Sequence, residues 1–140
     1  MATSNQYWLV GTMFGGTDDH LDEFRLRSYW YCWDRNASHN AATGHSGNSF
    51  ENQQERFLKI RVGDRIAAKK VISIPNQEME VRALGIVKDI DIKEWRAYVK
   101  WLPILDNNCP GRIVDLKGCT ASLHGPYQLN NAWIQEIFCT

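Results

Sequence analysis

Short segments in which apolar and polar residues alternate recur along most of this chain, and they constrain the fold more than any other feature. The first, YWLVGTMF at 7–14, is rich in β-forming residues and predicts a strand. Later segments have the same character: residues 57–73 with a turn at Gly63-Asp64, 79–92, 95–104 and 111–117. Helical spacing is clear in one early segment, and no βαβ rhythm is present. Five or six strands with short helices predict an α+β protein built on a small mixed barrel.

The early helical segment follows two glycines. Thr17 or Asp18 could cap it, acidic residues fill its first turn, and Leu21 and Phe24 lie at helical spacing. These features predict a helix over about 19–27.

Three other segments interrupt the strands. Residues 35–55 are polar and rich in Gly, Asn and Ser, which predicts a long loop. His124 precedes Gly125-Pro126, which predicts a turn. The closing segment NNAWIQEIFC at 130–139 fits either a helix or a last strand.

The charges are balanced overall but unevenly spread. The 140 residues carry 16 basic and 16 acidic side chains, so no basic coat points to nucleic acid. Residues 56–100 nevertheless contain eleven basic and six acidic residues. Five basic residues there are closely spaced: Lys59, Arg61, Arg65, Lys69 and Lys70. On charge alone a solvated strand face is the favoured explanation, and a stripe that follows phosphates is the alternative.

Motifs of the common catalytic classes are missing from the sequence. It contains no phosphate-binding loop with its lysine, no GxSxG elbow and no HExxH helix. The acidic residues around His20 have the spacing of a helix start, so a metal site is the less favoured explanation. No cofactor is predicted. Cys32 is a candidate nucleophile only if a base activates it, and packing is the simpler role.

Compartment is indicated by two features. The sequence shows no signal peptide and no apolar run long enough for a membrane span. The four cysteines lack CxxC spacing, which favours free thiols in a reducing cytosol. We therefore expect a cytoplasmic protein without a membrane partner.

Tryptophan is the most informative residue type. The sequence has six, of which Trp8, Trp101 and Trp133 fit core positions. The other three, Trp30, Trp33 and Trp95, lie near element ends beside charged residues. Flat aromatic faces at such places suit stacking on a planar ligand, at about 1–3 kcal/mol for each nucleobase stack. From the residues alone, a pocket and plain core are equally supported.

Several segments together resemble EVE-like domains of the PUA-like superfamily. In chain order they are YWLVGTMFGGTDDHLDEF, SYWYCWD, IRVGDRIAAKK, VRALGIVKDID and AYVKWLPI. These domains are related to the YTH readers of methylated adenine. The likeness is closest to the modules before the motor domain of McrB-type, modification-dependent restriction proteins. It covers most of the chain apart from residues 35–55 and 107–125.

The resemblance implies a twisted β-barrel of five to six strands flanked by short helices. It also implies an aromatic cage for a modified base, with Trp30 and Trp95 as walls, and Trp33 is a further candidate by position. Polar residues would read the base edge, and the matching positions are Thr12, Ser28 and Asp34. Phosphate contacts would come from Lys69, Lys70 and Arg65.

We expect residues 1–140 to form one domain, excised from a longer protein that carries a motor or nuclease elsewhere. The leading hypothesis is a non-catalytic reader that flips a methylated base out of DNA, for a restriction system that defends against phage. The alternative is a module that binds modified RNA or tRNA. A small enzyme acting on a nucleotide through Cys32, or through an Asp/His pair, is the third and least favoured hypothesis.

Overall fold

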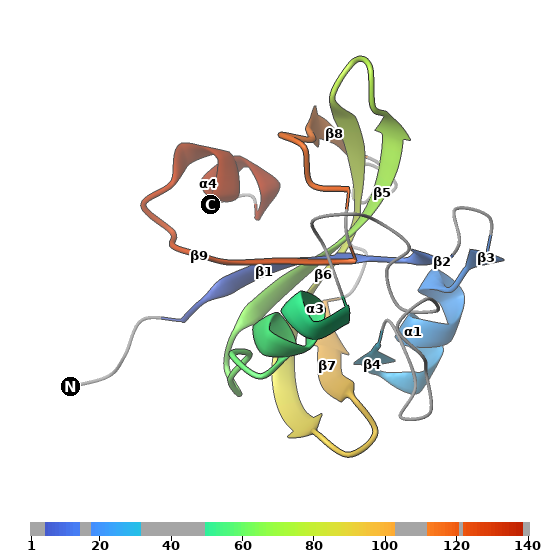
Figure 1. Cartoon of the computed structure of the whole chain (residues 1–140). Coiled ribbons are helices and arrows are strands. Elements are labelled where there is room, and N and C mark those ends of the chain that lie inside the picture. The colour runs from blue at the N-terminus through green and yellow to red at the C-terminus, as the bar shows by residue number, and fades with distance from the viewer. Residues whose placement is uncertain (1–4, 15–17, 32–49, 103–111, 121, 139–140) are drawn as a thin grey trace.

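A curled β-sheet forms the framework of the protein (Figure 1). The computed structural model describes residues 5–14, 18–31, 50–102, 112–120 and 122–138. The strands are β1 (Tyr7–Gly11), β2 (Met13–Phe14), β3 (Asp18–Asp19), β4 (Tyr29–Trp30), β5 (Arg65–Ser73), β6 (Glu78–Asp91), β7 (Arg96–Trp101), β8 (Arg112–Asp115) and β9 (Leu123–Tyr127). The helices are α1 (Leu21–Arg27), α3 (Phe50–Phe57) and α4 (Ala132–Ile137).

The main sheet has the order β4-β7-β6-β5-β1-β9, and β8 pairs with β6 outside this row. Strands β1 and β5 are parallel, and the other pairs are antiparallel. Strands β2 and β3 form a separate small hairpin. The row ends at β4 and β9, which do not pair with each other within the described residues. The curled sheet is therefore a half-barrel and not a closed barrel. The α+β class and the strongly curved sheet are confirmed.

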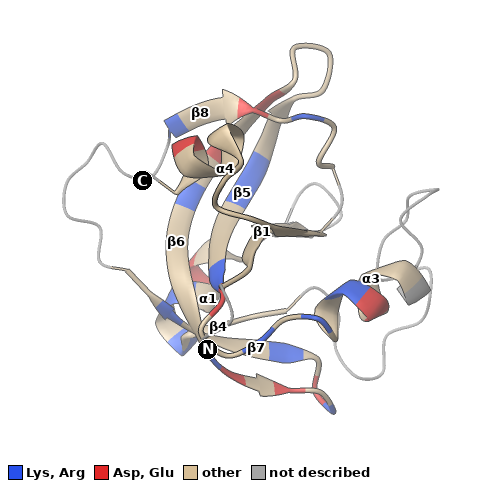
Figure 2. Cartoon of the chain, turned by 90° about the vertical axis from the view of Figure 1, so that its left-hand side faces the viewer, with Lys and Arg blue, Asp and Glu red and all other residues tan. Residues whose placement is uncertain are grey.

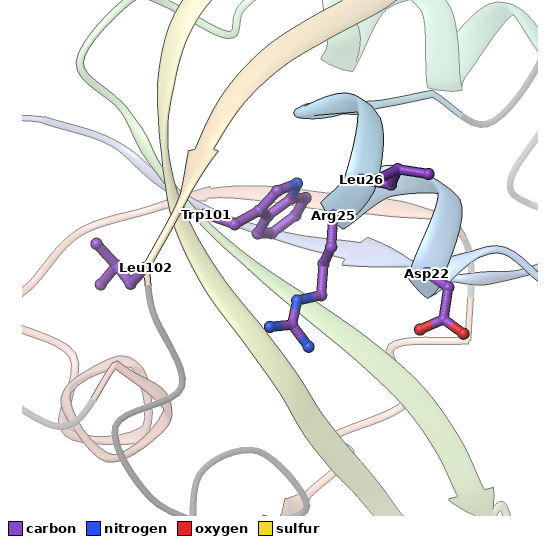
Figure 3. Close-up of a pocket in the computed structure, with 5 residues that line it drawn as sticks. All are labelled: Asp22, Arg25, Leu26, Trp101 and Leu102. Atoms are coloured by element: carbon purple, nitrogen blue, oxygen red, sulfur yellow. The ribbon is translucent and has the colours of Figure 1, made fainter.

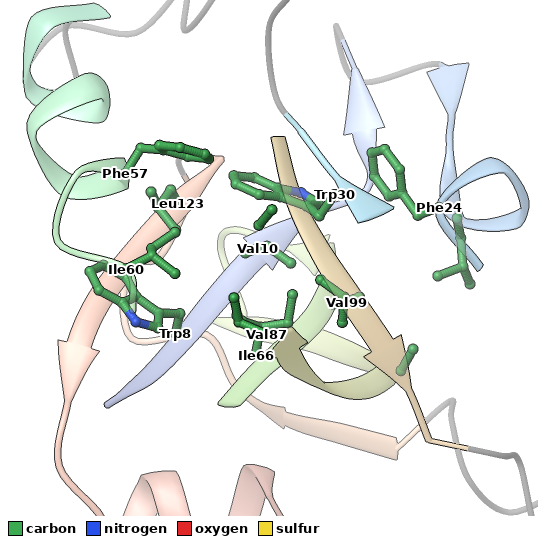
Figure 4. Packing of buried hydrophobic residues seen from close by; sticks show 14 residues of the cluster. Trp8, Val10, Phe24, Trp30, Phe57, Ile60, Ile66, Val87, Val99 and Leu123 are labelled. Carbon is green, nitrogen blue, oxygen red and sulfur yellow. The ribbon is translucent and has the colours of Figure 1, made fainter. Parts of the chain in front are cut away.

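Two core clusters lie on this sheet. The first core cluster gathers between β1, β6, β7 and β9 and includes Trp8, Val10, Trp30, Val87 and Val99 (Figure 4). The second core cluster lies under α4 and includes Leu9, Met79, Trp133 and Ile134. The sequence-based core positions of Trp8 and Trp133 are confirmed, and Trp101 is half-buried against the first core cluster.

The early helix is confirmed, but its cap differs from the expected one. The backbone N–H of Leu21 donates to the Asp19 carboxylate at 3.0 Å, and His20 occupies the cap position without a side-chain cap bond. Thr17 lies outside the described residues. The acidic first turn is present as Asp22 and Glu23. The carboxylates therefore stabilise the helix N-terminus, as the sequence indicates.

Helix α3 corrects two sequence-based predictions. Its residues were predicted as the end of the 35–55 loop and, at Phe57, as the start of a strand, whereas the strand begins only at Arg65. The helix buries Gln53 and Phe57, which are four residues apart and share one face. Gln53 bonds both backbone groups of Leu123, accepting its N–H at 2.9 Å and donating to its carbonyl at 3.2 Å. A buried face made partly of glutamine gives no hydrophobic periodicity, so the sequence pattern missed it.

The turn predicted at His124 is also wrong, because residues 123–127 form β9 beside β1. A proline is tolerated there because β9 is an edge strand. Gly125 has φ +137°, and a Cβ at this position would lie 2.7 Å from the Trp8 ring. A glycine and a proline that indicate a turn by sequence thus serve a close approach of two strands.

The C-terminal alternatives are settled as a helix. Asn131 caps α4 by accepting the N–H groups of Trp133 and Ile134. The Trp133 indole N–H donates to the Asp115 carbonyl at 2.8 Å, which ties α4 to β8.

Candidate nucleic-acid interface

Helix α3 lies at the open side of the half-barrel, against β9 (Figure 4). Its last residue, Phe57, is 1% exposed. The ring stacks on Trp30 of β4 with centroids 6.4 Å apart and planes at 24°. It also meets Trp95 edge-to-face, with centroids 5.4 Å apart. The two tryptophans that the sequence assigns to a cage therefore converge on one ring.

Trp30 is held from two directions. Its backbone pairs with Ala97 of β7, and its indole N–H donates to the Gly11 carbonyl at 2.9 Å. The side chain is fully buried. A tryptophan anchored in this way presents a fixed ring face.

Trp95 is held differently. It lies in the turn between β6 and β7 with φ +56°, a conformation that is costly for a residue with a large side chain. The ring is half-buried and packs against the first core cluster. Its place on a turn makes Trp95 the more accessible of the two tryptophans.

The polar residues predicted to read a base edge are in different surroundings. Thr12 is buried, its hydroxyl donates to the Lys69 carbonyl at 3.3 Å, and it accepts an N–H of Arg82 at 3.2 Å. Ser28 is exposed and ends α1 in the left-handed conformation. Trp33, Asp34 and Cys32 lie outside the described residues.

The predicted phosphate-binding residues do not form one exposed stripe. Lys69 is 3% exposed, and burial lowers the pKa of its ammonium to about 8. Lys70 and Arg65 are half-buried, and the Arg65 guanidinium donates to the Gly63 carbonyl. Basic side chains occur on β5, β6, β7 and α3 (Figure 2). A phosphate role for these three residues stays a prediction.

A polar cluster lies on the second-core side of β1. Burial, with the nearby charges of Lys69 and Arg56, lowers the pKa of His124 to about 3, so this imidazole is neutral at pH 7. Burial raises the pKa of the Cys119 thiol, which keeps it protonated. A thiol with a raised pKa is a poor nucleophile at pH 7, and an imidazole with so low a pKa is a weak general base.

Acidic residues of α1 form hydrogen bonds with their neighbours. Glu23 lies 2.7 Å from the His20 ring, and it accepts the hydroxyl of Tyr29 at 2.6 Å and that of Tyr31 at 3.2 Å. No group of three His, Cys, Asp or Glu residues within the described ranges could hold a metal ion.

The sequence did not predict the contact of Arg96 with Tyr29 and Tyr31. The Arg96 guanidinium carbon lies 4.7 Å from the ring centroid of Tyr29 and 5.0 Å from that of Tyr31. Both tyrosine rings pack against the first core cluster. The alternation Tyr29-Trp30-Tyr31 was the available signal, since it places the tyrosines on the strand face opposite to Trp30.

A shallow groove separates α1 from the end of β7 (Figure 3). Its volume is about 390 Å³, and its lining is Asp22, Arg25, Leu26, Trp101 and Leu102. The Trp101 indole N–H donates to the Phe24 carbonyl at 3.0 Å, so this ring is fixed under the helix. Leu26 is 80% exposed, and a groove open on this scale cannot enclose a base.

No described helix is long and apolar enough to cross a bilayer. Comparisons with protein-family models and with characterised proteins give no match for this chain.

Proposed function

We propose that this chain is a non-catalytic reader of a modified base in DNA, of the EVE-like kind within the PUA-like superfamily. The observation that carries the proposal is the convergence of Trp30 and Trp95 on Phe57 at the open side of the half-barrel. Two tryptophans from separate elements meet there around a single flat ring. A flipped base has the same shape and the same preference for aromatic faces.

In this proposal Phe57 occupies the place of the base in the free protein. A base that enters replaces the Phe57 ring. The contacts of Phe57 with Trp30 and Trp95 are lost when the base stacks on them, so only the difference between the two stacking energies favours binding. Extrusion of a base costs a few kcal/mol, and each new stack returns about 1–3 kcal/mol. Contacts with the modifying group then have to supply the free energy that stacking does not return. A base without that group lacks these contacts, which makes the binding selective.

The polar groups at the end of β1, where the resemblance places a reader of the base edge, already have partners within the protein. Trp30 occupies the Gly11 carbonyl, and the Thr12 hydroxyl already has a donor and an acceptor partner. Thr12 therefore holds the segment in place, and Ser28, Trp33 and Asp34 remain the candidates for further contacts. The wider role follows from the resemblance: a cytoplasmic targeting module for a motor and a nuclease in a restriction system.

The test is fluorescence-anisotropy binding to matched duplexes that carry cytosine, 5-methylcytosine, 5-hydroxymethylcytosine, adenine or N6-methyladenine. We expect a preference of tenfold or more, about 1.4 kcal/mol, for one modified base. RNA duplexes and single strands with the same bases form the second arm. A preference confined to RNA would move the function to RNA modification, and equal binding of all probes would overturn the proposal.

Trp95→Ala is the matching variant, because Trp95 lies half-buried on a turn whereas Trp30 is fully buried and anchored. We expect Trp95→Ala to remain folded and to lose the preference for the modified base. Trp133→Phe, in the second core cluster, is the control and should keep it.

A further inference from the structure

Arg96 lies next to Trp95, at the start of β7, in a notch between two aromatic rings. The Tyr29 and Tyr31 rings are 5.6 Å apart and nearly perpendicular, at 75°. The guanidinium carbon lies within 5.0 Å of both centroids. Stacking of this kind fixes the plane of a guanidinium while leaving its N–H donors unused.

The donors of Arg96 have no partner within the described part of the chain. Its Nε is buried without a hydrogen bond, and none of the ion pairs there includes Arg96. Asp91 faces Arg96 across the β6–β7 register, but its carboxylate accepts the backbone N–H of Glu94 at 3.1 Å. A planar, permanently charged fork with unused donors is suited to bind a phosphate or carboxylate.

Hydrogen bonds make the notch around Arg96 rigid. Both tyrosine hydroxyls are hydrogen-bonded to Glu23, which fixes the two rings. Burial and Glu23 raise the pKa of the Tyr29 phenol, and the charges of Arg96 and Arg27 oppose this rise. Arg27 is exposed in the last turn of α1 and adds to the positive charge that the Tyr29 phenol experiences.

This notch and the Trp30–Phe57–Trp95 assembly share one rim of the half-barrel. Tyr29 and Tyr31 flank Trp30 on the opposite face of the chain, and Arg96 follows Trp95 directly. We propose that Arg96, held by Tyr29 and Tyr31, binds the backbone phosphate next to the base that enters between Trp30 and Trp95. The inference rests on the proposed function. It places the principal phosphate contact on β7 and not on Lys69, which is buried.

The experiment measures binding of the whole chain to a duplex that carries the preferred modified base. Arg96→Gln removes the charge, and Lys117→Gln removes an exposed charge in the turn after β8 as the control. We expect Arg96→Gln to weaken binding about tenfold and to reduce the slope of log affinity against log salt by about 0.9. Lys117→Gln should change neither quantity.

A second measurement starts with the wild-type protein, whose loss of affinity at one linkage does not depend on the folding of a variant, and then repeats the series with Arg96→Gln. Single neutral methylphosphonate linkages are placed at each position around the modified base. One linkage should weaken wild-type binding about tenfold and should not weaken Arg96→Gln further.

The outcomes separate the two proposals. A wild-type protein that prefers a modified base, but shows equal affinity for every methylphosphonate position, would overturn the phosphate site and leave the reader function intact. Additive losses from the linkage and from Arg96→Gln would also overturn the site. A wild-type protein without any base preference would overturn the proposed function, and this inference with it.

Discussion

The indole N–H of Trp8 donates to the carboxylate of Asp64 at 2.9 Å, and this buried bond joins β1 to the turn before β5, across 56 positions of the sequence. The same carboxylate accepts the backbone and side-chain N–H groups of Gln6 and the backbone N–H of Arg61. Asp64 is 1% exposed. The turn at Gly63-Asp64 is thus the point at which β1, β5 and the end of the α3 segment are fastened together.

Replacing Asp64 should therefore unfold the protein readily. Asp64→Ala leaves the Trp8 indole and two backbone N–H groups without their acceptor, at a cost of about 3 kcal/mol or more in the free energy of unfolding. Urea denaturation measures this loss. Asp89→Ala is the control, because Asp89 is exposed and, among the described residues, accepts only the N–H of its neighbour Ile90. A loss below 1 kcal/mol for Asp64→Ala would contradict the prediction.

Phe57 should affect stability and ligand affinity in opposite directions. Phe57→Leu removes the ring that covers Trp30 and Trp95, so the free energy of unfolding should fall by about 1–2 kcal/mol. If a base replaces this ring, the affinity for the preferred modified duplex should rise several-fold.

The control for Phe57 is Phe24→Leu. Phe24 is equally buried in the first core cluster, and its aromatic contacts include Tyr29, Tyr31 and His20. The Phe24→Leu variant should lose a comparable free energy of unfolding without gaining affinity for the modified duplex. Weaker binding by Phe57→Leu would show that Phe57 supports the site and does not block it.

Gly85 is required by the close packing of β6 on β7. A Cβ there would lie 2.4 Å from a methyl of Val99 and 2.9 Å from the Trp101 ring. Gly85→Ala should lower the free energy of unfolding by about 2–3 kcal/mol, measured by thermal or urea denaturation. Gly118→Ala meets no atom within 4 Å but has φ +73°, so it isolates the backbone cost of about 1 kcal/mol. Equal losses for the two variants would exclude the steric explanation.

Lys69 should make stability rise with pH between about 8 and 10, and the raised pKa of Cys119 should offset part of this rise above pH 9. Burial lowers the pKa of Lys69 from 10.5 to about 8, so in this interval the unfolded chain binds more protons than the folded chain. The free energy of unfolding then increases with pH, by on the order of 3 kcal/mol over the full interval up to 10.5.

The rise should end near pH 10. Burial and Glu23 raise the pKa of Tyr31 from 10.0 to about 12, so above pH 10 the folded chain holds the extra proton and stability falls. Urea denaturation across pH 7–11 would show the maximum. Lys69→Met should flatten the rise below pH 10 and keep the fall above it, and an unchanged rise would assign it to another group.

The sequence predicted the parts of the fold where periodicity and burial agree. Alternation gave β1, β6 and β7, and the acidic first turn with Leu21 and Phe24 gave α1. It failed at α3, where Gln53 takes a core position through hydrogen bonds that leave no hydrophobic pattern. It failed again at β9, where Gly125-Pro126 indicates a turn although an edge strand tolerates both residues.

The candidate site was predictable only in part for a related reason. The position of Trp30 and Trp95 at element ends marked them as unusual, and the structure brings both onto Phe57. Phe57 itself carried no signal, because its segment was read as loop and strand. Arg96 was one basic residue among eleven, and only the pairing of β4 with β7 shows that it lies against Tyr29 and Tyr31.

The parallel pairing of β1 with β5 has a consequence for the order of events during synthesis. Strand β1 lies between β5 and β9, so both of its neighbours leave the ribosome after it. Tyr7 pairs with Arg65 and with Tyr127, which lie 58 and 120 positions further along the chain. The strand made first therefore stays unpaired until β5 has been translated, and its other edge stays open until β9 follows about 50 positions later. Contacts of such long range slow folding, so the nascent chain depends on protection of this early apolar segment until β9 arrives.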